Sequence, residues 1–258
     1  MLKLRITLAA LLLTFSFGGT LAWAQDDAPA EPEKNWSLDL GADYASLYLF
    51  RGSDLLADEP VIIPFAKYTY GGFAVYYYGY HGDLPVGDYA EADFGADYTF
   101  AVDKVSFTLG AVGYFFNGDA EEELAFLDTT ELYAIVGLDT LLAPTFSYYH
   151  DIDAVDGGYA SVAVSHSIAL GDSASLDFSG GVGFDFGYNN KAKGDGTPND
   201  VLLGLNIPWQ VSDHFALRAM VQHSIALDSL DSRRDSDPAF EESSEDETVF
   251  TVGGSFSF

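Results

Sequence analysis

The strongest constraint on the fold is the stretch at residues 248–258. Phe250, Val252, Phe256 and Phe258 alternate there with small or polar residues. A period of two is typical of a β-strand with one apolar face and one polar face. The stretch stops on an aromatic residue of the apolar face, and a carboxylate beside such a ring suits a membrane–water interface better than a packed core. It therefore predicts a strand that faces lipid.

Residues 1–24 predict a cleaved signal peptide. Two basic residues precede an apolar stretch at 6–17, and small residues stand at the expected cleavage point. A transmembrane anchor helix is the alternative, but it needs about 20 apolar residues, more than this stretch supplies. Residues 25–36, rich in Pro and acidic residues, predict a periplasmic linker, and residues 37–258 predict one barrel domain.

The charge balance excludes several classes of protein. The chain has 40 acidic residues against 11 Lys and Arg, and it has no Cys. Nucleic-acid binding needs a basic footprint, and so does a polybasic binder of membrane surfaces. Disulfides and thiolate metal sites are excluded, and we expect neither a cofactor nor a resident metal. No apolar run after residue 24 is long enough for a helical span, so membrane residence requires a barrel.

The spacing of alternating segments predicts the topology. About twelve segments are expected, at 37–50, 60–70, 73–81, 89–100, 105–116, 129–142, 145–151, 159–170, 175–187, 200–211, 215–227 and 248–258. Long polar connections alternate with tight ones, and an even strand number leaves both ends of the barrel wall on one side. This pattern predicts an all-β, transmembrane, antiparallel up-and-down β-barrel with short periplasmic turns and long extracellular loops.

The two faces of the segments agree with that fold. In segment 89–100, Phe94 and Tyr98 share one face, while Glu91, Asp93 and Asp97 share the other. On this parity no charged residue falls on a lipid face, where each Lys or Arg near the midplane would cost ~2–4 kcal/mol. A soluble β-sandwich is the alternative, and it would not require an outer face free of charge.

Three short motifs carry a resemblance to a known family. Residues 46–52 read SLYLFRG, residues 71–73 read GGF and residues 91–93 read EAD. Their order resembles the Gcw_chp family of outer-membrane barrels, and the likeness covers the first third of the chain. It implies a barrel in the bacterial outer membrane and no particular activity. The last strand resembles the C-terminal strand of such barrels, which implies an assembly signal read by the barrel-insertion machinery at Phe250, Phe256 and Phe258.

The inward faces carry the residues expected to line the lumen. They are Asp39, Asp43, Glu91, Asp93, Asp97, Glu131, Asp139, Asp177 and Asp185, with Lys67 and Arg218 as bases and Arg51 at the outer rim. A barrel sealed by a polar network is one interpretation. Burying so many carboxylates with few partners would be costly, so a hydrated lumen is favoured. We expect Arg51 to pair with Asp54 or Asp58 at the rim.

A hydrated lumen lined mostly by acidic residues favours a narrow porin-like channel for small cationic or neutral solutes. A non-conducting structural or adhesion barrel that acts through its acidic loops is the alternative. Catalysis is disfavoured, because His166 and Ser167 are adjacent in a strand and point to opposite faces. The expected partners are outer-membrane lipids and lipopolysaccharide, the insertion machinery, small solutes and, at the acidic loops, divalent cations.

Overall fold

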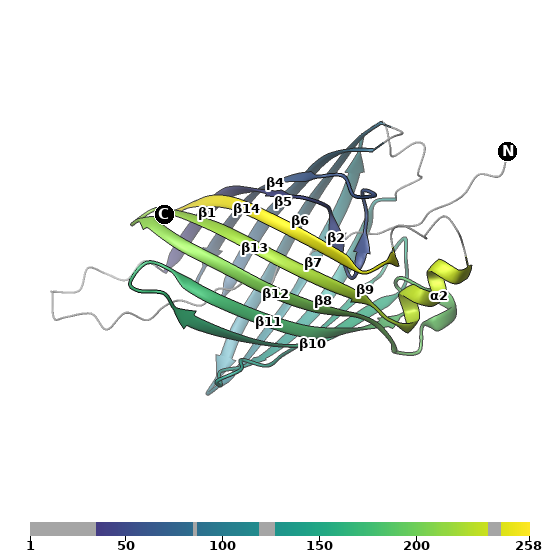
Figure 1. Cartoon of the computed structure of the whole chain (residues 1–258). Helices are drawn as coiled ribbons and strands as arrows, with labels where there is room; N and C mark the ends of the chain where they lie inside the picture. The colour runs from purple at the N-terminus through teal and green to yellow at the C-terminus, as the bar shows by residue number, and fades with distance from the viewer. Residues whose placement is uncertain (1–34, 85–86, 119–126, 237–243) are drawn as a thin grey trace, which may run out of the picture.

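A closed antiparallel β-barrel forms the molecule in the computed structural model, which describes residues 35–84, 87–118, 127–236 and 244–258 (Figure 1). Neighbouring wall strands are consecutive in the sequence, and β1 pairs with β14 to close the wall. The predicted fold class is confirmed. The twelve wall strands are β1 (Trp36–Ala45), β4 (Val61–Tyr70), β5 (Phe73–Leu84), β6 (Gly87–Val102), β7 (Val105–Asn117), β8 (Thr129–Leu138), β9 (Thr145–Asp151), β10 (Gly158–Ala169), β11 (Ser175–Phe186), β12 (Thr197–Ser212), β13 (Phe215–Ala226) and β14 (Glu247–Ser257).

The two ends of the barrel differ. The wall begins and ends at what we call the turn end, where short connections join the strands, such as the two residues between β4 and β5. The opposite end, the loop end, carries the longer connections and the four small elements (Figure 1). These elements are β2 (Leu49–Phe50), β3 (Ser53–Asp54), the 3₁₀ helix η1 (Lys191–Lys193) and α2 (Asp228–Ser236).

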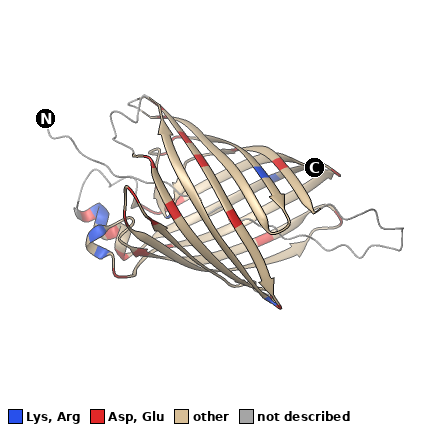
Figure 2. Ribbon diagram, turned by 180° about the vertical axis from the view of Figure 1, so that it is seen from behind, with Lys and Arg blue, Asp and Glu red and all other residues tan. Residues whose placement is uncertain are grey.

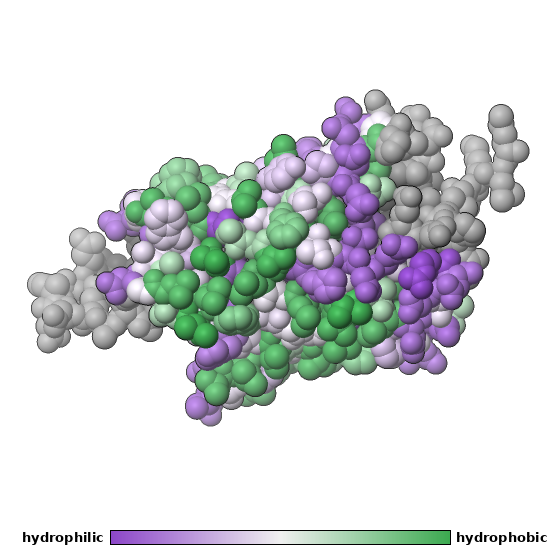
Figure 3. Space-filling view, in the orientation of Figure 1, coloured by the Kyte–Doolittle hydropathy of each residue, from purple (hydrophilic) through white to green (hydrophobic). Residues whose placement is uncertain are grey.

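The outer surface of the wall is apolar. Phe94 is 56% exposed and Phe250 is 62% exposed, although both are large aromatic residues. Figure 3 shows such residues as a hydrophobic band between more polar ends. Charged residues on the wall strands are mostly acidic (Figure 2). Because side chains alternate across a strand, one period-two pattern produces both the apolar band and a polar interior.

The first strand ends earlier than its alternation predicted. A strand was expected at 37–50, but β1 ends at Ala45, which pairs with Val61 of β4. The chain then turns into the barrel, so the apolar residues after Ala45 pack inside it rather than against lipid. The strand expected at 129–142 likewise ends at Leu138, and the residues after it form a turn.

The predicted signal peptide at 1–24 and most of the linker at 25–36 lie outside the described residues. Their boundaries stay predictions. Within the described part of the chain, no helix has the length and hydropathy needed to cross a membrane.

We predict that deleting Phe258 prevents barrel assembly while export continues. The backbone N–H of Phe258 donates to Leu38 O at 3.0 Å, and Leu38 N–H donates to Phe258 O at 3.1 Å. Deletion removes this pair at the closing seam together with an aromatic ring. The gel mobility of the protein before and after boiling measures folding, and Phe258→Tyr, which keeps the ring, should assemble normally. A truncated protein that folds like the wild type would contradict the prediction.

Candidate functional site

A short hairpin enters the barrel from the loop end. Residues 46–60, here called the plug hairpin, contain β2 and β3, which pair through Leu49–Asp54 and Phe50–Ser53. Arg51 and Gly52 form the two-residue turn, with φ angles of 47° and 80°. Positive φ at both positions is typical of a type I′ turn, which matches the twist of a hairpin. A Cβ atom on Gly52 would lie 2.8 Å from Cβ of Asp200, so the tip of the hairpin touches β12 directly.

The turn directs Arg51 into the interior, where its side chain is fully buried. Nη1 and Nη2 of Arg51 donate to the two carboxylate oxygens of Glu131 on β8 at 3.0 and 2.9 Å. Aromatic rings surround the guanidinium, with centroids 4.0–5.1 Å from Cζ; they belong to Phe50, Tyr149, Tyr159 and Tyr188. Such a bidentate pair, flanked by rings, depends on the planar guanidinium of Arg and could not be made by Lys.

The expected pairing of Arg51 at the rim with Asp54 or Asp58 is therefore wrong. Asp54 is occupied within the hairpin, because its carboxylate accepts the backbone N–H groups of Leu56 and Asp58. The guanidinium points the other way, toward Glu131. Pairing between residues 80 positions apart has no local sequence signal.

Residues of β12, α2 and the loop before η1 hold the tip of the plug hairpin. The backbone carbonyl of Arg51 accepts hydrogen bonds from Nδ2 of Asn199 at 2.8 Å and of Asn189 at 3.3 Å. Arg233 of α2 donates to Ser53 Oγ at 3.4 Å. Sequence reasoning missed these three residues, because Asn in a loop is usual in any turn and Arg233 stood in a charged loop.

Aromatic residues fill the lumen beside the plug hairpin. Tyr48 stacks on Tyr80 with ring centroids 4.5 Å apart and an interplanar angle of 8°. The buried cluster around them comprises Leu47, Phe50, Leu55, Leu56, Tyr89, Val112, Tyr114, Phe116, Tyr133, Tyr149, Val155, Tyr159 and Tyr188, among others. The barrel is therefore packed at its loop end, which agrees with a sealed interior there and not with a lumen hydrated along its whole length.

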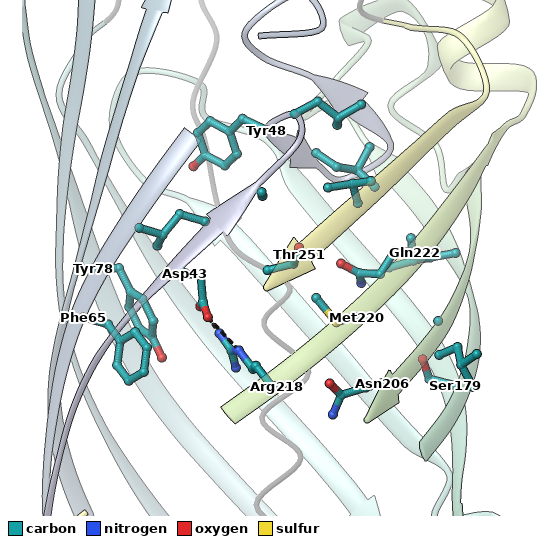
Figure 4. Close-up of a pocket in the computed structure, with 18 of the residues that line it drawn as sticks. Asp43, Tyr48, Phe65, Tyr78, Ser179, Asn206, Arg218, Met220, Gln222 and Thr251 are labelled. Atoms are coloured by element: carbon teal, nitrogen blue, oxygen red, sulfur yellow. Dashed lines mark hydrogen bonds and ion pairs between the residues drawn. The ribbon is translucent and has the colours of Figure 1, made fainter. Parts of the chain in front are cut away.

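A cavity of about 380 Å³ lies below the plug hairpin. Figure 4 shows Tyr48 at one end of it and the pair formed by Asp43 and Arg218 across it. Nε of Arg218 donates to Oδ1 of Asp43 at 2.8 Å, and a second bond joins Nη2 to Oδ2. Lys67, Asn206, Ser179, Gln222 and Thr251 add polar groups to the lining. The volume and the lining suit several water molecules or one small polar solute.

The predicted lining residues fall into three groups. Asp43, Glu91, Asp93, Glu131, Asp177 and Asp185 are buried. Asp39 and Asp97 are partly exposed on inward faces, as are Lys67 and Arg218 at the cavity. Asp139 was expected inside the span, but it is exposed in the turn that follows β8, because the strand ends one residue earlier.

Most of the buried acids accept several hydrogen bonds. Asp177 accepts bonds from the hydroxyls of Ser167 at 2.6 Å and Ser175 at 2.8 Å. Asp185 accepts bonds from three successive backbone N–H groups of the loop at 188–190 and from Ser229 of α2. Asp185 organises the loop end and Asp177 organises the turn between β10 and β11, so neither lines an aqueous path. Their burial also explains why counting inward carboxylates overstates the charge that faces water.

Ser167 and His166 lie on opposite faces of β10. Ser167 donates to Asp177 inside the barrel, whereas the exposed ring of His166 is 3.0 Å from the carbonyl of Leu141. In the loops, Asp54, Asp58 and Glu247 bring one carboxylate oxygen each within 4.8 Å of one another. Two oxygens of Asp54 already accept backbone N–H groups, so divalent cation binding at the acidic loops stays a prediction.

No protein-family model matches the chain, and no curated protein matches its sequence. The resemblance to the Gcw_chp family is therefore not confirmed. A structure of the KdgM porin in complex with disordered oligogalacturonate is similar, with a TM-score of 0.54 and 10% identity, over 86% of this chain and 99% of that one. A NanC porin structure matches with a TM-score of 0.54 and 8% identity, over 85% and 98%. At this identity the likeness shows a shared barrel fold alone.

We predict that Arg51→Met lowers the free energy of unfolding by ~3–5 kcal/mol, because it leaves the buried Glu131 carboxylate without its counter-charge. Urea unfolding in detergent would measure the loss. The double variant Arg51→Met/Glu131→Leu should recover most of it, since neither charge is then left alone.

Arg234→Met is the matched control. Arg234 pairs with Asp231 at 2.8 Å on α2, where both side chains are partly exposed. Such surface pairs contribute about 1 kcal/mol or less. Equal losses in the Arg51 and Arg234 variants would contradict a structural role for the buried pair.

Proposed function

We propose that this protein is an outer-membrane channel for small cationic or neutral solutes, with passage limited by the plug hairpin. The cavity of about 380 Å³ is the observation that carries this proposal. Its lining includes Lys67, Arg218, Gln222 and Asn206. If the interior served stability alone, apolar side chains filling this space would stabilise the barrel more than charged and polar groups around a cavity. Polar groups around open space favour water and solute there.

The outward surface supports location in a membrane. Side chains such as Phe94, Leu203 and Phe250 are about half exposed, which is favourable in lipid and unfavourable in water. The predicted signal peptide and the aromatic C-terminal strand agree with export and assembly in the outer membrane. Outer-membrane lipids, lipopolysaccharide and the insertion machinery are then the proposed partners. The barrel fold shared with the KdgM and NanC porins is compatible with conduction.

The plug hairpin is the proposed gate. It is one contiguous segment between β1 and β4, and Ala45 and Val61 at its two ends pair directly in the wall. The wall is therefore complete without it. Displacement of this segment alone would connect the cavity to the loop end, leaving every wall strand in place.

The proposed preference for cations comes from the mouths of the barrel. Around the cavity, Asp43 faces Lys67 and Arg218, so the charges there nearly balance. Exposed acids surround both mouths, at Asp58, Glu59, Glu245 and Asp246 of the loop end and at Asp103, Asp139, Asp172 and Asp213 of the turn end. A negative potential at the entrances raises the local concentration of cations and steers them in.

The packed loop end also fits the second candidate, a non-conducting barrel that acts through its loops. The two candidates differ in whether an opened lumen conducts.

We predict that replacing residues 46–60 by Asn-Gly raises the single-channel conductance in planar bilayers. An Asn-Gly turn joins two paired strand ends in a type I′ hairpin, so Ala45 and Val61 can be connected without strain. Mobility shift on boiling verifies that the shortened barrel folds, and Arg234→Met serves as a loop-end control that keeps the plug. A folded, shortened barrel that does not conduct would leave the non-conducting barrel as the function.

Selectivity is tested on the shortened barrel. Under a KCl gradient the reversal potential should favour K⁺ over Cl⁻. Neutralising two exposed acids of the turn-end mouth, through Asp103→Asn and Asp139→Asn, should move the potential toward zero at low salt and less at high salt, because salt screens the field. A preference for Cl⁻ would contradict the proposed cation selectivity and leave conduction itself intact.

A further inference from the structure

Four buried oxygens on neighbouring strands have no hydrogen-bond partner among the described residues. They are Oε1 of Glu91, Oδ1 and Oδ2 of Asp93, and the hydroxyl of Tyr80. Glu91 and Asp93 are each 1% exposed, and Tyr80 is 0% exposed. Buried polar groups are nearly always hydrogen-bonded, and buried carboxylates without a partner are among the most expensive groups in a protein. As ionised carboxylates and a hydroxyl, these side chains do not supply one another with enough hydrogen-bond donors.

The strand register brings these oxygens together. Glu91 and Asp93 lie two residues apart on β6, so both point inward, and Tyr80 of β5 stands directly opposite Glu91. The two carboxyl groups are within hydrogen-bonding reach of each other. Neither can donate while both are ionised, which leaves their facing oxygens without a partner.

The plug hairpin closes over this pair. The hydroxyl of Tyr48 donates to Oε2 of Glu91 at 3.1 Å, and the hydroxyl of Tyr89 donates to the same oxygen. The ring of Tyr48 stacks on Tyr80. Tyr48 therefore joins the plug hairpin to the Glu91 carboxylate, and the strength of this contact depends on the charge and position of that carboxylate.

We propose that Glu91 and Asp93 form a proton-binding site that holds one shared proton and thereby locks the plug hairpin in the lumen. With the proton on Asp93, its hydroxyl donates to Oε1 of Glu91. The shared proton thus gives Oε1 of Glu91 and one oxygen of Asp93 a partner. It leaves one negative charge, on Glu91, with three donors around it: Tyr48, Tyr89 and Asp93.

The surrounding charges favour this assignment. Two adjacent ionised carboxylates repel each other strongly where water is excluded. Arg51 of the plug hairpin already pairs with Glu131. The titratable and charged groups around the pair are Tyr48 and Arg51 of the plug hairpin, Asp43 of β1, Tyr76, Tyr78 and Tyr80 of β5, Tyr89 and Asp97 of β6, Tyr114 of β7, Glu131 of β8 and Tyr188 of the loop after β11. None of these is a free cation that could neutralise the second carboxylate.

Loss of the proton would loosen the hairpin. Asp93 and Glu91 would then both be anions in contact, and repulsion would move the Glu91 carboxylate from the hydroxyl of Tyr48. This consequence rests on the proposed channel function, because it predicts that alkaline pH opens the lumen.

Infrared spectroscopy of the folded protein tests the site without reference to conduction. At pH 6 the wild type should show a protonated carboxyl band that is absent from Asp93→Asn and is lost on raising the pH. Asn at position 93 mimics the protonated acid, because its amide can donate to Oε1 of Glu91. Asp97→Asn, which changes the next inward acid of the same strand, is the control and should keep the band. No difference between wild type and Asp93→Asn would overturn the proposal.

Thermal unfolding provides a second measurement. The folded wild type binds a proton that the unfolded chain has released above about pH 5, so its stability falls as pH rises until the pair itself ionises. Over that range the Tm of Asp93→Asn should rise relative to wild type by ~3–5 °C per pH unit. A Tm difference that does not change with pH, or a wild-type Tm that EDTA lowers while Asp93→Asn is unaffected, would overturn the proposal, the latter because a metal ion would occupy the site.

Conductance separates this proposal from the channel function. The wild type should conduct more at pH 9 than at pH 6, whereas Asp93→Asn should stay at the low level at both. If the infrared and Tm results hold but the shortened barrel without residues 46–60 never conducts, the proton site stands and the channel function fails. If the shortened barrel conducts but the infrared band is absent, the channel stands and the proton site fails.

Discussion

The loop end of the barrel depends on one buried cation. A guanidinium removed from water costs several kcal/mol unless a carboxylate and well-placed acceptors replace its hydration. Around Arg51 the chain supplies Glu131 from β8, four aromatic rings and a turn with two positive φ angles. Asn199 and Asn189 hold the same residue by its carbonyl. The hairpin, the wall and the loops therefore meet at a single residue, Arg51, through its side chain and its backbone carbonyl.

The lumen divides into two parts with different chemistry. Near the loop end, tyrosine hydroxyls and backbone N–H groups satisfy acids such as Glu91 and Asp185, and aromatic rings exclude water. Toward the turn end, Asp43, Arg218 and Lys67 face a cavity that has room for solvent. The lumen is packed in one part and open in the other because the plug hairpin, which enters from the loop end, does not reach the turn end. A polar network in a region without water is stable only where every member has a hydrogen-bond partner. The unpaired oxygens of Glu91 and Asp93 therefore point to a proton between the two carboxyl groups.

The barrel could be predicted from the sequence because its signals are local. Period-two alternation, tight turns and an even strand number follow from neighbouring residues, and they predicted the number and order of the wall strands correctly. The interior could not be predicted in the same way. Tyr48 and Phe50 continue the apolar alternation of β1, yet they pack inside the lumen, and no local pattern distinguishes this from a lipid-facing strand. The partner of Arg51 and the exposure of Asp139 depend on where strands end and on contacts between distant segments. Inward acids were identified by parity, but parity does not distinguish a hydrated face from a buried one.

The seam between β1 and β14 has a consequence for how the molecule forms. Asp39 and Ser257, which pair across it, are 218 residues apart in sequence. Each of the other wall contacts joins consecutive strands, so hairpins can form early, whereas this one must wait for the end of the polypeptide. Until then the growing sheet has two open edges with unpaired backbone groups. Such groups are costly in lipid, and they can pair with the strands of a neighbouring chain. Non-local closure of this kind is slow. Pairing of β14 with β1 removes both open edges in one step, so the last strand to be added decides when the sheet is closed.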